Sequence, residues 1–190
     1  LNKATGEVVW RSKELDEEAT YASPIIATIE GVRQYVVMTQ FGIAAVAAEN
    51  GKLLWYYERS RPYSDVVIPT PVCQGNYVYA STGDGCDMVE VSREDDGTFT
   101  VEDVYTSRNM KNSIGGFVLH DGHVFGTSER RGWVCQDFAT GKIAWYQRAN
   151  KTVGDGSLIF ADGHLYLYGE KTAEISLIEA SSEEWSEKGR

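Results

Sequence analysis

Basic side chains concentrate in the segments that separate the chain's apolar runs. Eight of its 18 lysines and arginines fall in four short loops between residues 58 and 155. Guanidinium and ammonium groups pair with carboxylates and phosphates, so these residues are candidates for holding an anionic ligand or an acidic partner segment, and Tyr63 in an arginine-rich loop is a further contact candidate. The eight are Arg59, Arg61, Arg108, Lys111, Arg130, Arg131, Arg148 and Lys151.

The same residues have a simpler interpretation as solvated loop charge, since charged side chains are mostly exposed in any protein. An acidic loop near the start of the chain opposes a uniformly basic surface, because it contains Glu14, Asp16, Glu17 and Glu18. The residue types alone leave both interpretations open.

The sequence contains only weak signals for a metal site or a catalytic nucleophile. Asp84 and Asp87 in STGDGCD form a loop carboxylate pair suited to Ca²⁺, although glycine-rich acidic segments more often only form turns. His123 and His164 each follow an Asp-Gly pair at equivalent places, which favours a structural role, and with His120 they do not make the three or four converging ligands of a zinc site. No G-x-S-x-G segment occurs.

The three cysteines, Cys73, Cys86 and Cys135, match neither a disulfide framework nor a zinc motif. Cys73 and Cys86 would pair only if the segments that carry them meet in the fold. Cysteine usage therefore predicts no compartment.

Composition describes a folded, acidic protein. The net charge of −10 disfavours nucleic acid as a partner, and 42% hydrophobic residues spread along the chain disfavour disorder. No run of about 18 apolar residues occurs, so we expect no transmembrane segment.

A repeat organises the loops. Gly6, Gly51, Gly97 and Gly141 are separated by 45, 46 and 44 residues, and the residue four positions later is Trp10, Trp55, Val101 and Trp145. Such a period indicates a repeated supersecondary unit. The glycines suit tight turns, and the apolar residues after them favour strands.

Each unit offers three short apolar strands before the glycine turn and one after it, as in PIIAT, QYVVMTQ and IAAVAAE. Four antiparallel strands in about 45 residues predict an all-β propeller blade, with a β-sandwich as the structural rival. We expect blades at about 21–60, 66–108, 113–149 and 153–190, with 1–12 as the outer strand of a preceding or closing blade.

Second-strand aromatics could be mistaken for a ligand platform, but packing between blades is the stronger interpretation, since large aromatics fill such gaps. They are Tyr35, Tyr77, Tyr79, Phe125, Tyr166 and Tyr168. Four blades imply part of a seven- or eight-bladed ring or, less favoured, a small closed ring. Open blade edges would invite self-association.

The segments NKATGEVVW, AAENGKLLW and DFATGKIAW resemble the tryptophan-docking repeat of the pyrroloquinoline quinone (PQQ) type propellers over essentially the whole chain. The resemblance implies that Trp10, Trp55 and Trp145 pack between adjacent blades. Val101 replaces tryptophan in the second unit, so that blade is expected to dock less tightly. Asp137 keeps the motif's aspartate.

Dehydrogenases of this family hold PQQ between a tryptophan and an adjacent-cysteine disulfide, with Ca²⁺ and an aspartate base. No adjacent cysteines occur here, so we expect no cofactor and no catalysis, with a fragment of a PQQ- and calcium-dependent dehydrogenase as the alternative. The resemblance favours a scaffold that binds a protein or ligand through its loops, like the PQQ-like repeat lipoprotein of outer-membrane assembly. It implies an exported, periplasmic or cell-surface bacterial protein.

Overall fold

The computed structural model describes residues 1–59, 66–129 and 131–190, whose strands form four sheets of four consecutive antiparallel strands. The first two sheets contain β1 (Ile25–Ile29), β2 (Val32–Met38), β3 (Gly42–Ala47), β4 (Leu53–Glu58), β5 (Val72–Gln74), β6 (Tyr77–Thr82), β7 (Gly85–Arg93) and β8 (Phe99–Ser107). The last two contain β9 (Phe117–His120), β10 (His123–Ser128), β11 (Gly132–Asp137), β12 (Ile143–Gln147), β13 (Gly156–Ala161), β14 (His164–Gly169), β15 (Ile175–Glu179) and β16 (Glu187–Gly189). The predicted all-β fold of four antiparallel blades is confirmed.

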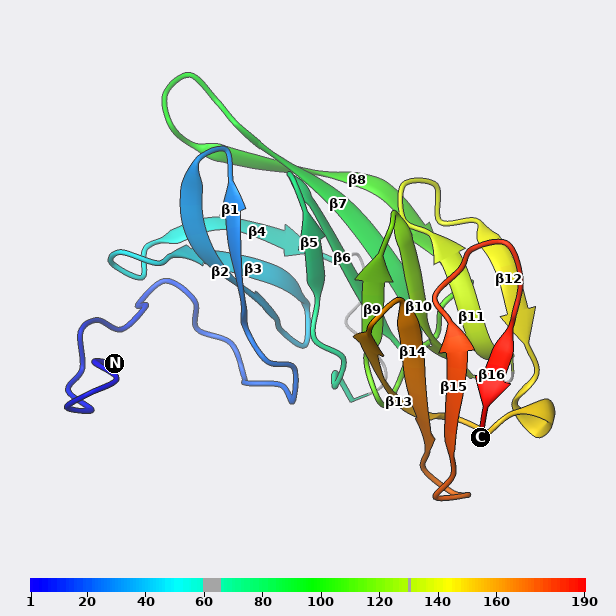
Figure 1. Cartoon of the computed structure of the whole chain (residues 1–190). Helices are drawn as coiled ribbons and strands as arrows, with labels where there is room; N and C mark the ends of the chain where they lie inside the picture. Colours follow the sequence, from blue (N-terminus) through cyan, green and yellow to red (C-terminus); the bar gives the residue numbers. More distant parts are fainter. Residues whose placement is uncertain (60–65, 130) are drawn as a thin grey trace.

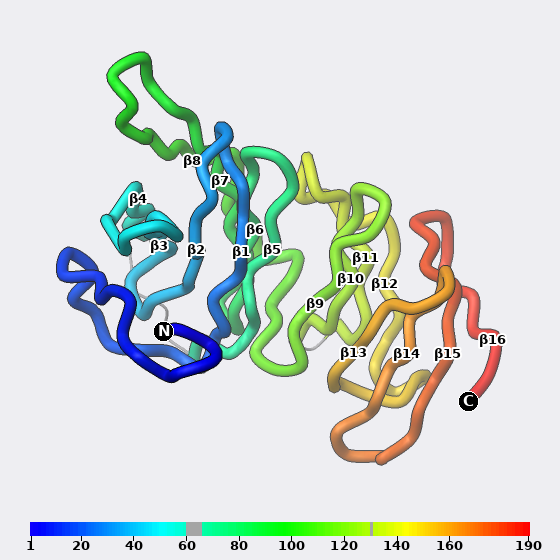
Figure 2. The backbone as a smooth tube through the Cα atoms, turned by 60° about the vertical axis from the view of Figure 1, so that its left-hand side comes forward, coloured from blue at the N-terminus to red at the C-terminus, as the bar shows by residue number. Residues whose placement is uncertain are grey.

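The blades follow one another along an open arc, in sequence order, with the first and fourth at opposite ends (Figures 1 and 2). A short 3-10 helix, η1 (Ala149–Lys151), lies in the connection from the third blade to the fourth. In the described part of the chain, each hydrophobic cluster joins two consecutive blades and none joins the fourth to the first. The structure is therefore not the small closed ring.

The core sits between the sheets because successive residues of a strand point to opposite faces. On β6, Val78 joins the cluster shared with the first blade, whereas its neighbour Tyr79 joins the cluster shared with the third. The third cluster brings Phe125 and Trp133 against Leu167 of the fourth blade. Each inner sheet thus has two apolar faces to bury.

Aromatic side chains dock on the turn between the third and fourth strands of the blade that follows them in the chain. The Trp10 indole N–H donates to the Ala48 carbonyl at 3.1 Å. A Cβ at Gly51 would lie 2.3 Å from the Trp10 ring, and the φ of Gly51 is +75°. Glycine is required there both for its backbone conformation and for the close approach of the indole.

The Trp145 indole repeats this contact, since its N–H donates to the Ser181 carbonyl at 2.8 Å. Trp145 also meets Trp185 edge-on, with 5.8 Å between ring centroids. Edge-to-face pairs are favoured by the aromatic quadrupole. Trp185 therefore belongs to the junction between the third and fourth blades.

The second blade docks through Tyr105, and the prediction that Val101 stands in the tryptophan position is wrong. Trp55 and Trp145 each pair with the residue just before a β-bulge, and in the second blade the residue in that register is Tyr105, opposite Met88. The Tyr105 hydroxyl donates to the Phe138 carbonyl at 2.8 Å, and its ring closes on Gly141.

The docking position was misassigned because the β7–β8 hairpin is longer than the corresponding hairpins of the other blades. Strands β7 and β8 each have nine residues, so Gly97 lies farther from the sheet than the other turn glycines, and Val101 pairs with Val91 in the extension. A Cβ at Gly97 would meet only the Arg93 guanidinium, at 3.4 Å. Counting four residues from the glycine therefore misses the docking position.

The first 24 residues lie against the first blade and contain no strand, and the described residues hold no preceding blade with which 1–12 could pair, so its place as an outer strand stays a prediction. The Trp10 ring of this segment contacts Tyr35, with 6.0 Å between ring centroids. The Leu53 N–H donates to the Glu14 carboxylate at 2.7 Å. Part of the blade's outward face is covered in this way.

The Asp-x-x-Thr-Gly turn has a local explanation. The Asp137 carboxylate accepts hydrogen bonds from the Thr140 N–H at 2.7 Å and from its hydroxyl at 2.6 Å. The Thr140 hydroxyl is the main reason why the pKa of Asp137 is lowered. The motif therefore fixes a turn.

All three cysteines are free. Cys73 packs in the cluster shared with the first blade and Cys86 in the cluster shared with the third, so they lie on opposite faces of one sheet. A bond between them does not form because their side chains point apart.

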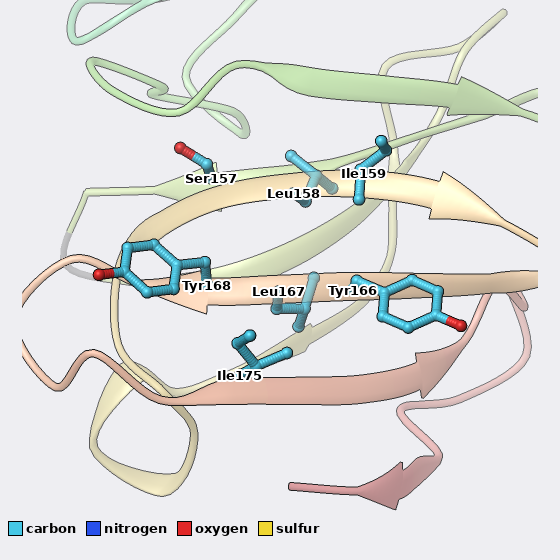
Figure 3. A pocket seen from close by; sticks show the side chains of 7 residues that line it. All are labelled: Ser157, Leu158, Ile159, Tyr166, Leu167, Tyr168 and Ile175. Atoms are coloured by element: carbon cyan, nitrogen blue, oxygen red, sulfur yellow. The ribbon is translucent and has the colours of Figure 1, made fainter.

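Burial of the second-strand aromatics follows their place in the arc. Tyr79 and Phe125 are buried as expected, but Tyr77, Tyr166 and Tyr168 are exposed. Tyr79 and Phe125 pack against the following blade, Tyr166 and Tyr168 lie on the fourth blade (Figure 3), which no described blade follows, and Tyr77 is exposed at the start of β6.

Replacing Trp55 by alanine tests the blade junction. Trp55 is 3% exposed, packs in the first cluster and donates to the Gln34 amide oxygen at 2.7 Å. We expect a loss of about 3 to 5 kcal/mol in the free energy of unfolding, measured by urea denaturation. Tyr21→Ala, at an exposed ring, should change it by less than about 0.5 kcal/mol. A cost for Trp55→Ala below about 1 kcal/mol would contradict this junction.

Candidate functional site

One side of the arc gathers the loops that the sequence singles out. Because strand direction alternates within each blade, the turns between second and third strands emerge on the same side as the connections between blades. We call this side the loop face. Of the predicted basic set, Arg61 and Arg130 lie outside the described residues, as does Tyr63.

Arg59 binds within the protein. Its guanidinium forms a two-pronged ion pair with the Asp87 carboxylate, at 2.7 Å from Nε and 3.2 Å from Nη2. The Asp87 side chain is fully buried and that of Arg59 is 14% exposed. The Thr106 hydroxyl adds a hydrogen bond to the same carboxylate at 3.0 Å. Arg59 therefore links the first two blades and offers little surface to a partner.

Tyr57 makes a second polar link between these blades. Its hydroxyl donates to the Asp103 carboxylate at 2.5 Å. Burial raises the pKa of Tyr57 well above its usual range, and the Asp103 hydrogen bond adds to the effect. The phenol therefore stays protonated and remains a donor.

The remaining described cations of the predicted set differ in how far they are exposed to solvent. Arg108, Arg148 and Lys151 are exposed, whereas Lys111 and Arg131 are half-buried. The structure thus separates exposed cations, which a partner can reach, from Arg59, which holds blades together.

A groove of about 450 Å³ opens between the third and fourth blades on the loop face. Carboxylates and lysines line it together with the apolar Ile114 side chain. The charged residues are Lys111, Glu129, Asp155, Glu170 and Lys171. Its local charge is therefore mixed, with one more carboxylate than lysine.

Backbone hydrogen bonds hold the walls of this groove. The Glu129 N–H donates to the Lys111 carbonyl at 2.9 Å, and the Glu170 N–H donates to the Asp155 carbonyl at 3.0 Å. The first bond joins the connection before the third blade to the end of β10. The second joins the connection before the fourth blade to the end of β14.

Asp155 is the carboxyl of the groove whose proton affinity is perturbed. Partial burial raises its pKa, Glu129 and Glu170 raise it further, and Lys171 opposes them. A cation placed beside Asp155 would favour its ionised form.

The sequence interpretation missed this groove because it followed the basic residues alone. Glu129 and Asp155 stand in the same loops as Arg131 and Arg148, so a count of both signs in each loop would have indicated a mixed surface.

The metal candidates are held in local structure. The Asp84 N–H donates to the Thr82 hydroxyl at 3.2 Å within a turn, and Asp87 is paired with Arg59. His123 and His164 make the same contact, each ring Nδ1 lying 2.8 or 2.7 Å from the carbonyl oxygen two residues earlier. Within the described ranges, no three His, Cys, Asp or Glu side chains form a group that could hold a metal ion.

The described residues do not fit the PQQ and calcium pair that the resemblance implies. Cys73 and Cys86 lie on opposite faces of one blade, and the chain has no adjacent cysteines. The fully buried Asp87 carboxylate is already neutralised by a guanidinium.

Comparison with known proteins gives a family. The model of the family described as outer membrane protein assembly factor BamB (PQQ_2) matches residues 1–147. No curated protein matches the chain. Among the residues that the structure describes, no helix has the length and apolarity needed to cross a bilayer.

Solved structures share the fold. BamB from Moraxella catarrhalis is 15% identical with a TM-score of 0.53, covering 87% of this chain and 47% of its own. Quinohemoprotein alcohol dehydrogenase ADHIIG from Pseudomonas putida HK5 is 20% identical with a TM-score of 0.58, covering 92% and 34%. The computationally designed Ika4 protein is 12% identical with a TM-score of 0.57, covering 93% and 99%. The chain therefore spans about half of the Moraxella protein and a third of the dehydrogenase.

Replacing Arg59 by alanine tests the buried ion pair. Asp87 would then be left buried without its counter-charge, so we expect a loss of about 3 to 5 kcal/mol in the free energy of unfolding. Arg108→Ala is the matched control at an exposed arginine, and its effect should stay within about 0.5 kcal/mol. Equal urea midpoints for the two variants would show that the pair contributes nothing to blade docking.

Proposed function

Because the chain belongs to the family described as outer membrane protein assembly factor BamB, we propose that it is a non-catalytic scaffold that binds a partner protein segment at its loop face. The observation that carries the proposal is the groove between the third and fourth blades, held by backbone hydrogen bonds on both walls. Loops on a rigid scaffold are where binding residues concentrate.

The charges of the groove indicate what kind of segment fits. Glu129, Asp155 and Glu170 attract basic side chains, while Lys111, Lys171 and the exposed cations nearby attract acidic ones. Complementary potentials steer and select partners. A polypeptide that carries both basic and acidic side chains matches this surface better than a polyanion does. The proposed partner therefore differs from the purely acidic one that the cations alone suggest.

The family description also supports a proposal for where in the cell the protein is located. A factor of outer membrane assembly works outside the cytoplasm, so we propose an exported, periplasmic or cell-surface location for this chain. The match to the dehydrogenase adds no support for catalysis, since at 20% identity it concerns the fold alone.

Labelled ten-residue peptides test the groove. We expect a peptide of alternating lysine and glutamate to bind more tightly than lysine–alanine or glutamate–alanine peptides in fluorescence anisotropy. The double variant Glu129→Gln and Asp155→Asn should weaken the mixed peptide about 3- to 10-fold, as expected for two partly exposed ion pairs. Since the pKa of Asp155 is raised, affinity should start to fall on acidification at a higher pH than for an ordinary aspartate.

Glu183→Gln is the matched control, because Glu183 is an exposed carboxylate in the β15–β16 connection, on the side opposite the loop face. It should leave binding unchanged. The groove proposal would be overturned if the glutamate–alanine peptide bound most tightly of the three. The exposed arginines would then be the binding site if Arg108→Glu and Arg148→Glu abolished this binding while the double variant Glu129→Gln and Asp155→Asn kept it.

Addition of PQQ with Ca²⁺ separates the scaffold from the dehydrogenase alternative. We expect no shift in melting temperature and no protein-bound quinone absorbance after gel filtration, because the Asp87 carboxylate is already paired with Arg59 and the chain has no adjacent cysteines. A saturable thermal shift that requires both PQQ and Ca²⁺ would contradict the scaffold proposal and favour the enzyme.

A further inference from the structure

The hairpin between β3 and β4 contains the only asparagine of the chain that is followed by glycine, Asn50 before Gly51. Asn50 is exposed to solvent. Glycine has no side chain to shield its backbone nitrogen. In such a pair this nitrogen attacks the carboxamide carbon of the preceding residue, a reaction that proximity within one chain favours. The pair is therefore the position in this sequence with the least steric protection against spontaneous deamidation.

The turn holds the two reacting groups next to each other. The Asn50 side-chain oxygen Oδ1 accepts a hydrogen bond from the Lys52 N–H at 2.9 Å. Because Lys52 directly follows Gly51, this bond keeps the carboxamide beside the Gly51 backbone. The Gly51 N–H itself donates to the Ala47 carbonyl at 2.9 Å. The attacking nitrogen is thus occupied in the closed turn and is released only when the turn opens.

The corresponding turns of the other repeats lack this chemistry. The residue before the turn glycine is Thr5, Asp96 or Thr140. The Thr98 hydroxyl is the main reason why the pKa of Asp96 is lowered, so this carboxyl is ionised at neutral pH and resists nucleophilic attack. The Asp96 carboxylate accepts the N–H two residues later at 2.9 Å, the same bond at the same length as in the asparagine turn. Aspartate therefore fits this turn as well as asparagine does.

Trp10 packs directly on the reactive pair. A Cβ at Gly51 would lie 2.3 Å from the indole ring, so the ring leaves no room for a shift of this backbone toward it. The indole N–H bonds to the Ala48 carbonyl, which belongs to the same turn. Docked Trp10 therefore favours the closed turn, in which the Gly51 nitrogen is occupied.

We propose that Asn50 is a site of spontaneous deamidation that docked Trp10 restrains, and that its isoaspartate product releases Trp10 from the first blade. When the turn opens, the Gly51 nitrogen attacks Asn50 Cγ, the Cγ–Nδ2 bond breaks, and the proton of the attacking nitrogen passes through water to the leaving ammonia. Water then opens the succinimide that has formed. Addition at Cγ gives aspartate, whereas addition at the Asn50 backbone carbonyl gives isoaspartate, whose main chain is longer by the side-chain methylene group.

The two products differ in their effect on the docking contact. Aspartate keeps the side-chain oxygen and the chain length of the turn, as the Asp96 turn illustrates. The additional methylene group of isoaspartate displaces Gly51 from the indole ring and moves the Ala48 carbonyl away from the indole N–H. Aspartate therefore leaves Trp10 docked, and isoaspartate weakens its docking.

Peptide mapping by mass spectrometry after incubation in mildly alkaline buffer tests the reaction. We expect Asn50 to deamidate faster than Asn150, an exposed asparagine that precedes lysine. Trp10→Ala should accelerate the reaction about 10-fold, as for an opening free energy lowered by roughly 1.4 kcal/mol. Tyr21→Ala, which removes an exposed ring of the same segment, should leave the rate unchanged. Asn50→Thr should abolish the reaction at this turn.

Exchange of the Trp10 indole proton with solvent, followed by NMR, tests the consequence. In the chromatographically separated isoaspartate form, we expect this proton to exchange faster, while the Trp133 indole proton, which bonds to the Gly154 carbonyl, keeps its rate. Asn50→Asp should leave both rates unchanged. Deamidation of Asn50 no faster than that of Asn150, a deamidation rate that Trp10→Ala leaves unchanged, or unaltered indole exchange in the isoaspartate form would each overturn the proposal.

Discussion

Burial of both faces of every inner sheet is the constraint on which this structure depends. A four-stranded sheet with one wet face needs apolar residues only at alternate positions, but β6 places Val78 in one cluster and Tyr79 in the next. Such a sheet is stable only between two neighbours. The blade order, the arc and the position of the loop face all follow from stacking sheets of this kind in sequence order.

Polar contacts set how closely the stacked sheets approach. Three aromatic side chains donate hydrogen bonds to carbonyls in the next hairpin, and Gly51 and Gly141 leave room for two of the rings. The Arg59–Asp87 pair acts at the loop side of the first junction. Because a buried charge is costly without its partner, this pair favours one relative position of the two blades.

The sequence was sufficient to predict the blades because period and turn chemistry are local properties. The turn glycines and three tryptophans stand at nearly constant spacing, and residue alternation marks the strands. The docking role of Tyr105 was not predicted because the β7–β8 hairpin is longer than the others. Only the strand pairing shows that Tyr105 lies opposite the residue that precedes the bulge. The loop face was harder to predict, since residue type does not tell whether an arginine meets a partner or, like Arg59, a buried carboxylate.

The separation of the core into three clusters also determines the order in which we expect the blades to unfold. Among the described residues, the second and third blades each share two clusters, whereas the fourth shares one. In a linear array, stability is close to a sum over nearest-neighbour junctions. Amide protons of the fourth blade should therefore exchange through partial unfolding that leaves the middle of the array intact, giving a gradient of protection rather than a single cooperative opening.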